Sequence, residues 1–201
     1  MKIPLRTTIL LAGSLTLAAC ATAPGPVEVT RFHDPARLAA AERGTVAVTA
    51  APGLVDSLEL APYRAAVSDE LRRLGFTVVD GGSARHRAEI RVERFARDGA
   101  GRRSPVSVGV GGSTGSYGSG LGVGLGINLG GGGGPRAGTQ LAVTLREAAG
   151  NASVWEGRAE VEYPARSDFA AARTNAQALA GALFRDFPGG NGETVRVNAG
   201  R

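Results

Sequence analysis

Three stretches of this chain alternate between apolar and polar side chains, a pattern typical of β-strands that bury one face. In residues 154–163, Trp155 begins the apolar face and Glu156 begins the polar one. Residues 88–97 and 139–147 repeat the alternation. Because one face of each strand stays polar, the sequence predicts an antiparallel or mixed sheet with one face in water.

Shorter segments and two helical patterns complete the predicted domain. Residues 27–33, 45–50 and 76–80 have the composition of strands. A first helix is expected to open at Pro62, where proline suits the first turn, and to end at Gly75.

A last helix is expected after Pro164, with Ser167 as its N-cap. Its apolar positions recur at helical spacing and predict a buried stripe of Phe169, Ala172, Ala176, Leu179 and Leu183. The order of strands, helix, strands and helix predicts a single α+β domain over residues 27–197. In this domain, two helices cover one face of the sheet, and a glycine-rich hairpin or loop is inserted.

The composition excludes several kinds of chemistry. The only lysine is Lys2, so the chain has neither a P-loop lysine nor a catalytic Schiff-base lysine in its body. Two histidines, His33 and His86, with one cysteine are too few for a closed Cys/His zinc site. We therefore expect no metal and no cofactor.

The first residues have the layout of an export signal. Lys2 and Arg6 precede an uncharged, mostly apolar stretch that is too short to span a membrane. The segment Leu17-Ala18-Ala19-Cys20 resembles the bacterial lipobox, and it contains the only cysteine of the chain. The resemblance implies cleavage of the signal peptide, residues 1–19, between Ala19 and Cys20, followed by acylation of Cys20 with chains such as palmitate.

The acylated cysteine would begin a short tether, residues 20–26, rich in proline and small residues. Two or more acyl chains give stable membrane attachment. Because Ala21 and Thr22 follow the cysteine where inner-membrane lipoproteins tend to have aspartate, the resemblance favours the outer membrane, with the domain facing the periplasm. Removal of Lys2 and Arg6 lowers the net charge from +5 to +3. The remaining arginines alternate with glutamates, so nucleic acid is not an expected partner.

A glycine-rich insertion, residues 104–134, interrupts the alternating strands. Between residues 109 and 134, 14 of 26 residues are glycine, which argues against a helix because each interior glycine costs about 1 kcal/mol. The apolar residues fall on every second position from 121 to 129, as in a strand.

Three interpretations stay open for this insertion: a mobile loop with partial strand character, a hairpin of 105–111 against 120–129 that extends a sheet, and a membrane-inserted hairpin. Its apolar residues form the predicted contact surface, namely Val106, Val108, Val110, Tyr117, Leu121, Val123, Leu125, Ile127 and Leu129.

Candidate catalytic residues have simpler explanations. Ser113 lies in a G-x-S-x-G match, but a glycine run produces that match by chance and no helix pattern follows it. We expect His33 to lie at a surface or edge and His86 to be solvated at the start of a strand. Trp155 is expected in the core. These expectations predict that the protein is not an enzyme.

Four segments together resemble lipoproteins that carry the domain of unknown function 4136. They are Val29-Thr30-Arg31-Phe32-His33, the glycine-rich GVGGSTGSYGSGLGVGLG, Val154-Trp155-Glu156-Gly157-Arg158-Ala159, and the ending from Ala182 to Thr194 with F-P-G-G-N-G-E-T. The resemblance covers most of residues 27–197. It implies a bacterial envelope lipoprotein of α+β type with no assigned activity, and it carries no catalytic residue over to this chain.

The sequence thus predicts an outer-membrane lipoprotein that acts as a binding or scaffolding module for an envelope protein partner. One alternative is a structural or pore-forming protein whose glycine-rich hairpins oligomerise in the membrane. Another is a serine hydrolase that uses Ser113.

Overall fold

The computed structural model describes residues 24–41, 43–97, 103–106 and 135–199. Several predicted sites lie outside these residues: the cleavage site at Ala19 and Cys20, Ser113, and the contact residues Val108, Val110, Tyr117, Leu121, Val123, Leu125, Ile127 and Leu129. The elements in chain order are β1 (Val27–His33), α1 (Pro35–Ala40), β2 (Thr45–Ala50), α2 (Ala61–Arg73), β3 (Thr77–Val78), β4 (His86–Arg97), β5 (Arg103–Val106), β6 (Arg136–Glu147), β7 (Ser153–Pro164), the 3₁₀-helix η1 (Asp168–Ala170), α3 (Ala172–Phe184) and β8 (Thr194–Val197).

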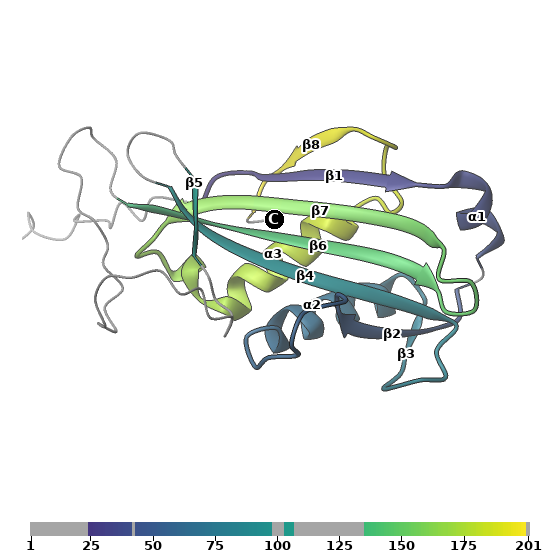
Figure 1. The fold of residues 1–201 in the computed structure, drawn as a ribbon. Coiled ribbons are helices and arrows are strands. Elements are labelled where there is room, and N and C mark those ends of the chain that lie inside the picture. Colours follow the sequence, from purple (N-terminus) through teal and green to yellow (C-terminus); the bar gives the residue numbers. More distant parts are fainter. Residues whose placement is uncertain (1–23, 42, 98–102, 107–134, 200–201) are drawn as a thin grey trace, which may run out of the picture.

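The described strands form one mixed sheet in the order β3-β2-β4-β6-β7-β1-β8, with β5 paired to β4 (Figure 1). β2 runs parallel to β3 and β4, and the other pairs are antiparallel. The three 12-residue strands β4, β6 and β7 lie at its centre. The predicted α+β class with a mixed sheet is therefore confirmed.

The alternation in the sequence sets which face of each central strand is buried. In β7, Trp155, Ala159 and Val161 are at most 1% exposed, while Glu156 and Arg158 between them are exposed. β6 buries Leu141, Val143 and Leu145 in the same way. Burial of this apolar area, at about 25 cal/mol per Å², is the main favourable term in the folding of such a domain.

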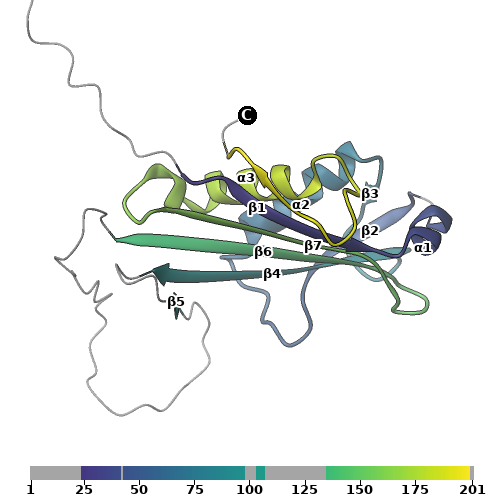
Figure 2. The ribbon, with the colours of Figure 1, turned by 90° about the horizontal axis from the view of Figure 1, so that it is seen from above.

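Two longer helices pack on the buried side chains of these strands. α3 contacts β7, β1 and β6, and α2 contacts β2, β3 and β4. The helices also contact each other, and Figure 2 shows them side by side along the sheet. Their buried residues recur at helical spacing: Tyr63, Val67 and Leu71 in α2, and Ala176, Leu179 and Leu183 in α3.

Several details differ from the sequence prediction. The strand expected at residues 76–80 is reduced to the two residues of β3. Ser167 is not a side-chain N-cap, because its hydroxyl donates to the Pro164 carbonyl at 2.8 Å and η1 precedes α3. The short elements α1 and β8 were not predicted. Asp34 caps α1 by accepting hydrogen bonds from the backbone of Ala36 and Arg37.

Gly157 tests how closely the core is packed. A Cβ atom at this position would lie 2.3 Å from the Trp155 ring and 2.8 Å from Leu183 Cδ1. We expect Gly157→Ala to lower the free energy of unfolding by about 1–3 kcal/mol, because neither neighbour has room to move. Gly150→Ala is the control, since nothing lies within 4 Å of its added Cβ. Urea unfolding measures both, and equal stabilities would contradict this packing.

Candidate functional site

Three segments of the chain meet at the C-terminal end of α3. Arg31 comes from β1, Trp155 from β7, and Phe187, Pro188 and Asn191 from the loop before β8. The junction thus joins three elements that are distant in the sequence.

Arg31 is the centre of this junction. It is 5% exposed, and its guanidinium donates to the carbonyl oxygens of Leu183 at 2.8 Å, Ala182 at 3.0 Å and Arg185 at 2.8 Å. The last carbonyl groups of a helix have no hydrogen-bond donors within the helix, and the negative end of the helix dipole lies there. A buried guanidinium supplies the missing donors and a positive charge. Burial lowers the pKa of Arg31, and the nearby carboxylate of Asp186 opposes that shift.

The loop that follows α3 fits around Arg31. Gly189 has a φ of +81°, and a Cβ there would lie 2.6 Å from the Arg31 side chain. The Asn191 side chain bonds both the amide and the carbonyl of His33 at 3.1 Å, so it takes the place of a neighbouring strand at the edge of β1. Residue 192 continues this contact, since its amide donates to the Arg31 carbonyl at 2.8 Å.

Trp155 holds the other side of the same loop. Its indole nitrogen donates to the Pro188 carbonyl at 3.1 Å, and its ring stacks on Phe184 with centroids 5.3 Å apart. Phe187 also contacts the Trp155 ring. Trp155 is 1% exposed, so the expectation that it is a core residue is confirmed. It presents no surface for a sugar or lipid.

His86 is not the solvated residue that the sequence predicted. It is fully buried and its ring meets Phe76 edge-on, with centroids 5.9 Å apart. The physical reason is that β4 starts at His86 and is flanked there on both sides, by Val46 of β2 and Glu147 of β6. His33 is half-buried at the end of β1, which agrees with an edge position.

The sheet face on the other side of the core is polar and carries charges in rows. The strand register aligns side chains in rows that run across β4, β6, β7 and β1. One row is mainly acidic and contains Glu93, Gln140, Glu160 and Glu28. The next row contains two arginines and consists of Arg91, Ala142, Arg158 and Thr30. A second acidic row contains Glu89 and Glu156, with the half-exposed Phe32 at its end. We call this surface the charged face.

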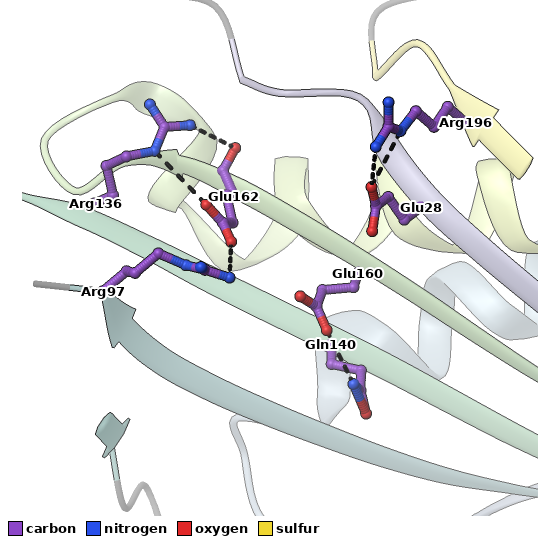
Figure 3. A network of polar contacts seen from close by, with 7 residues as sticks. All are labelled: Glu28, Arg97, Arg136, Gln140, Glu160, Glu162 and Arg196. Carbon is purple, nitrogen blue, oxygen red and sulfur yellow. Dashed lines mark hydrogen bonds and ion pairs between the residues drawn. The ribbon is translucent and has the colours of Figure 1, made fainter. Parts of the chain in front are cut away.

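Ion pairs within the charged face connect neighbouring strands (Figure 3). Arg196 bonds Glu28 through two nitrogens, each at 3.1 Å, and Gln140 donates to Glu160 at 3.2 Å. The Glu162 carboxylate lies between Arg97 and Arg136. Such exposed pairs each stabilise the fold by at most about 1 kcal/mol.

A second polar cluster is buried between the helices and the sheet. Tyr63 of α2 donates to Asn175 Oδ1 of α3 at 3.0 Å, and Thr139 and Tyr163 share a hydrogen bond of 2.8 Å. Burial raises the pKa of Tyr63 above its ordinary value, although hydrogen bonding to Arg94 and the charge of Arg94 act in the opposite direction. The cluster helps to fix α2 and α3 on the sheet, and its hydroxyl groups are hydrogen-bonded within the core.

The larger cavity, of about 310 Å³, lies between α2, α3 and the residues after β8. Its ionisable lining residues are Glu70, Arg73 and Arg185, and Glu70 is already paired with Arg73. A second cavity, of about 120 Å³, adjoins Phe76 and Phe187. Among the described residues, neither of these two cavities is lined by a histidine or by two carboxylates.

The predicted contact residues are represented in the described part of the chain by Val106 alone, which pairs with Arg94 in the β4–β5 ladder. Within the described ranges, no group of three or more His, Cys, Asp or Glu residues could hold a metal ion. None of the helices described is both long and apolar enough to cross a membrane.

The role of Arg31 was missed in the sequence, although a signal for it exists. Arg31 has the same parity in β1 as Val27 and Val29, so the alternation puts its charge on the apolar face. A buried arginine requires several acceptors, which indicates a partner such as a helix terminus.

Replacement of Arg31 by lysine tests the junction. Lysine keeps the charge but cannot present a planar set of donors to three carbonyls. We expect Arg31→Lys to lower the free energy of unfolding by about 2–3 kcal/mol. Arg158→Lys, on the charged face, is the control and should change stability by less than about 0.5 kcal/mol. Matching losses for the two variants in urea unfolding would show that Arg31 does not hold the junction.

Alkaline titration tests the buried cluster. Because the pKa of Tyr63 is raised in the folded state, its stabilising effect is complete below the ordinary tyrosine pKa of 10.0. The effect is lost as the pH rises through the folded-state pKa. We therefore expect stability to fall in alkali with a steeper slope in the wild type than in Tyr63→Phe. Thermal melts across this pH range give both slopes, and an unchanged slope in Tyr63→Phe would refute the assignment.

No family model matches the chain, and no curated protein matches it. Among solved structures, a PelC dodecamer from Paraburkholderia phytofirmans is similar, with 15% identity, a TM-score of 0.45, and coverage of 78% of this chain and 93% of the other. A PDZ domain protein from Parabacteroides distasonis is similar with 8% identity, a TM-score of 0.42, and coverage of 86% of this chain and 39% of the other. Likenesses this distant do not bear on function.

Proposed function

We propose that this protein is a lipid-anchored binding or scaffolding module of the bacterial envelope, without catalytic activity. Acyl chains on Cys20 hold it to the outer membrane, and the domain faces the periplasm. Its partner is an envelope protein that contacts the edge of the sheet and the insertion. The resemblance of residues 27–197 to lipoproteins with the domain of unknown function 4136 agrees with this proposal.

The observation that carries the proposal is the position of β5. This strand leads into the glycine-rich insertion, and among the described strands it pairs with β4 alone. An edge strand with one unpaired side can accept a strand from another protein through backbone hydrogen bonds. Alternating apolar residues of the insertion would then provide the specificity.

The charged face supplies a second contact surface. Its rows of opposite charge would accept only partners with a matching pattern, since like charges placed opposite each other cost several kcal/mol.

Two finer features of the fold belong to the same proposal. The contacts of α2 and α3 with the sheet support an arrangement in which these two helices together cover one face. The opposite face stays available to a partner. The insertion then continues from β5 as a loop or hairpin that extends the sheet at its edge.

Replacing the insertion tests this function. A variant in which a Gly/Ser linker of about eight residues substitutes for residues 107–134 keeps β5 and should remain folded. A photo-crosslinking amino acid at Val106 should capture a discrete partner in intact cells from the otherwise unchanged protein. The same amino acid should capture nothing in the linker variant, because the partner contacts residues of the insertion.

Ala149 is the control position, because it is exposed in the turn between β6 and β7, at the far end of the sheet. Equal crosslinking from Val106 with and without residues 107–134 would remove the insertion from the contact. A pattern of defined high oligomers of this chain alone would instead favour the pore-forming alternative.

A further inference from the structure

Residues 24–26 of the tether and the last residues of β4 and β7 lie at one end of the sheet. The amide of Gly25 donates to the Glu162 carbonyl at 2.9 Å. Arg97 at the end of β4 is level with Arg136 at the start of β6, and Arg136 is level with Pro164 at the end of β7. Both ribbon views place the start of β1 and the end of β4 on the left (Figures 1 and 2).

We call this region the tether end, and it consists of Gly25, Arg97, Pro135, Arg136, Glu162 and Arg166. Arg166 belongs to it because the adjacent residue 165 donates its amide to the Pro135 carbonyl at 2.9 Å. Arg166 is exposed.

Among the described residues of the tether end, guanidinium groups outnumber carboxylates, since Arg97, Arg136 and Arg166 accompany one carboxylate, Glu162. One carboxylate, Glu162, pairs with two arginines, Arg97 and Arg136 (Figure 3). The side chains of all three are between 28% and 39% exposed, so they remain accessible to an anion. Guanidinium groups match phosphate oxygens in charge and in planar geometry, and therefore bind phosphate well.

The length of the tether limits which end of the domain can reach the membrane. Five residue steps separate Cys20 from Gly25, which span about 17 Å when fully extended. The 12-residue central strands are about 40 Å long at 3.4 Å per residue. If Cys20 is held at the lipid surface, the tether end of the sheet must lie close to that surface. The opposite end of the sheet, at the turn between β6 and β7, can reach the lipid only when the sheet lies flat on the membrane.

We propose that the tether end faces the membrane and that Arg97 and Arg136 bind the phosphates of anionic lipid headgroups. This inference rests on the proposed acylation of Cys20. It gives the domain a fixed orientation, with the central strands rising from the membrane and the insertion leaving the fold close to the lipid. The partner of the insertion is then one that is itself at the membrane surface.

Fluorescence quenching in vesicles tests the orientation with the protein as it is purified from membranes after natural processing. A fluorophore is placed at Pro135→Cys in the tether end or at Ala149→Cys at the far end, both of which are exposed. The vesicles contain phosphatidylcholine with or without phosphatidylglycerol, and a nitroxide on the lipid headgroup is the quencher. We expect strong quenching at position 135 and little at position 149, with a larger difference when phosphatidylglycerol is present.

Paired charge variants test the contact itself. Arg97→Gln with Arg136→Gln should lower the ratio of docked to undocked protein about fivefold for each charge removed. The matched control, Arg72→Gln with Arg87→Gln, removes the same charge at the last turn of α2 and the start of β4, away from the tether end, and should leave quenching unchanged. Arg97→Lys with Arg136→Lys keeps the charge and should retain most docking, which separates loss of charge from loss of fold.

Equal quenching at positions 135 and 149, or no effect of Arg97→Gln with Arg136→Gln, would overturn the inference. Release of the docked domain by inorganic phosphate, added at the same concentration as the lipid phosphate, would also overturn the inference. That result would show that the arginines bind free phosphate rather than lipid headgroups. Flotation of the same samples separates the two proposals. Protein that does not float with vesicles contradicts the acylation of Cys20, whereas protein that floats without the predicted quenching contradicts only the orientation.

Discussion

The buried guanidinium of Arg31 is the interaction on which the rest of the structure depends. It joins β1 to the last carbonyls of α3, and the loop that leads to β8 folds around it. A cation buried without these acceptors would cost several kcal/mol, so the strand, the helix terminus and the loop are stable only together. This mutual dependence explains how three segments distant in the sequence become one junction.

That junction lies on the core side of the sheet, whereas the charged face lies on the opposite side. Trp155, Arg31 and the loop after α3 are committed to the fold and present little surface. The charged face is not part of this junction, and its ion pairs and hydrogen bonds join neighbouring strands. Under the proposed function, the partner contacts the charged face, so substitutions there can change recognition without loss of the core.

Local periodicity predicted the elements that local forces determine. The alternation in β4, β6 and β7 identified their buried faces, and helical spacing identified α2 and α3. Long-range contacts determine the rest: β8 has four residues and exists because β1 lies beside it, and the burial of His86 depends on neighbours from both sides. Of the candidate site, Val106 in β5 lies within the described residues, and Cys20 and the rest of the insertion stay predictions from the sequence.

Attachment through Cys20 is the claim on which location, orientation and partner class all depend. Its most direct test is intact-protein mass spectrometry of the chain purified from membranes in detergent. The predicted result is a polypeptide that begins at Cys20 and carries acyl chains on that residue. A polypeptide that retains residues 1–19, or one whose Cys20 thiol is free, would contradict the claim.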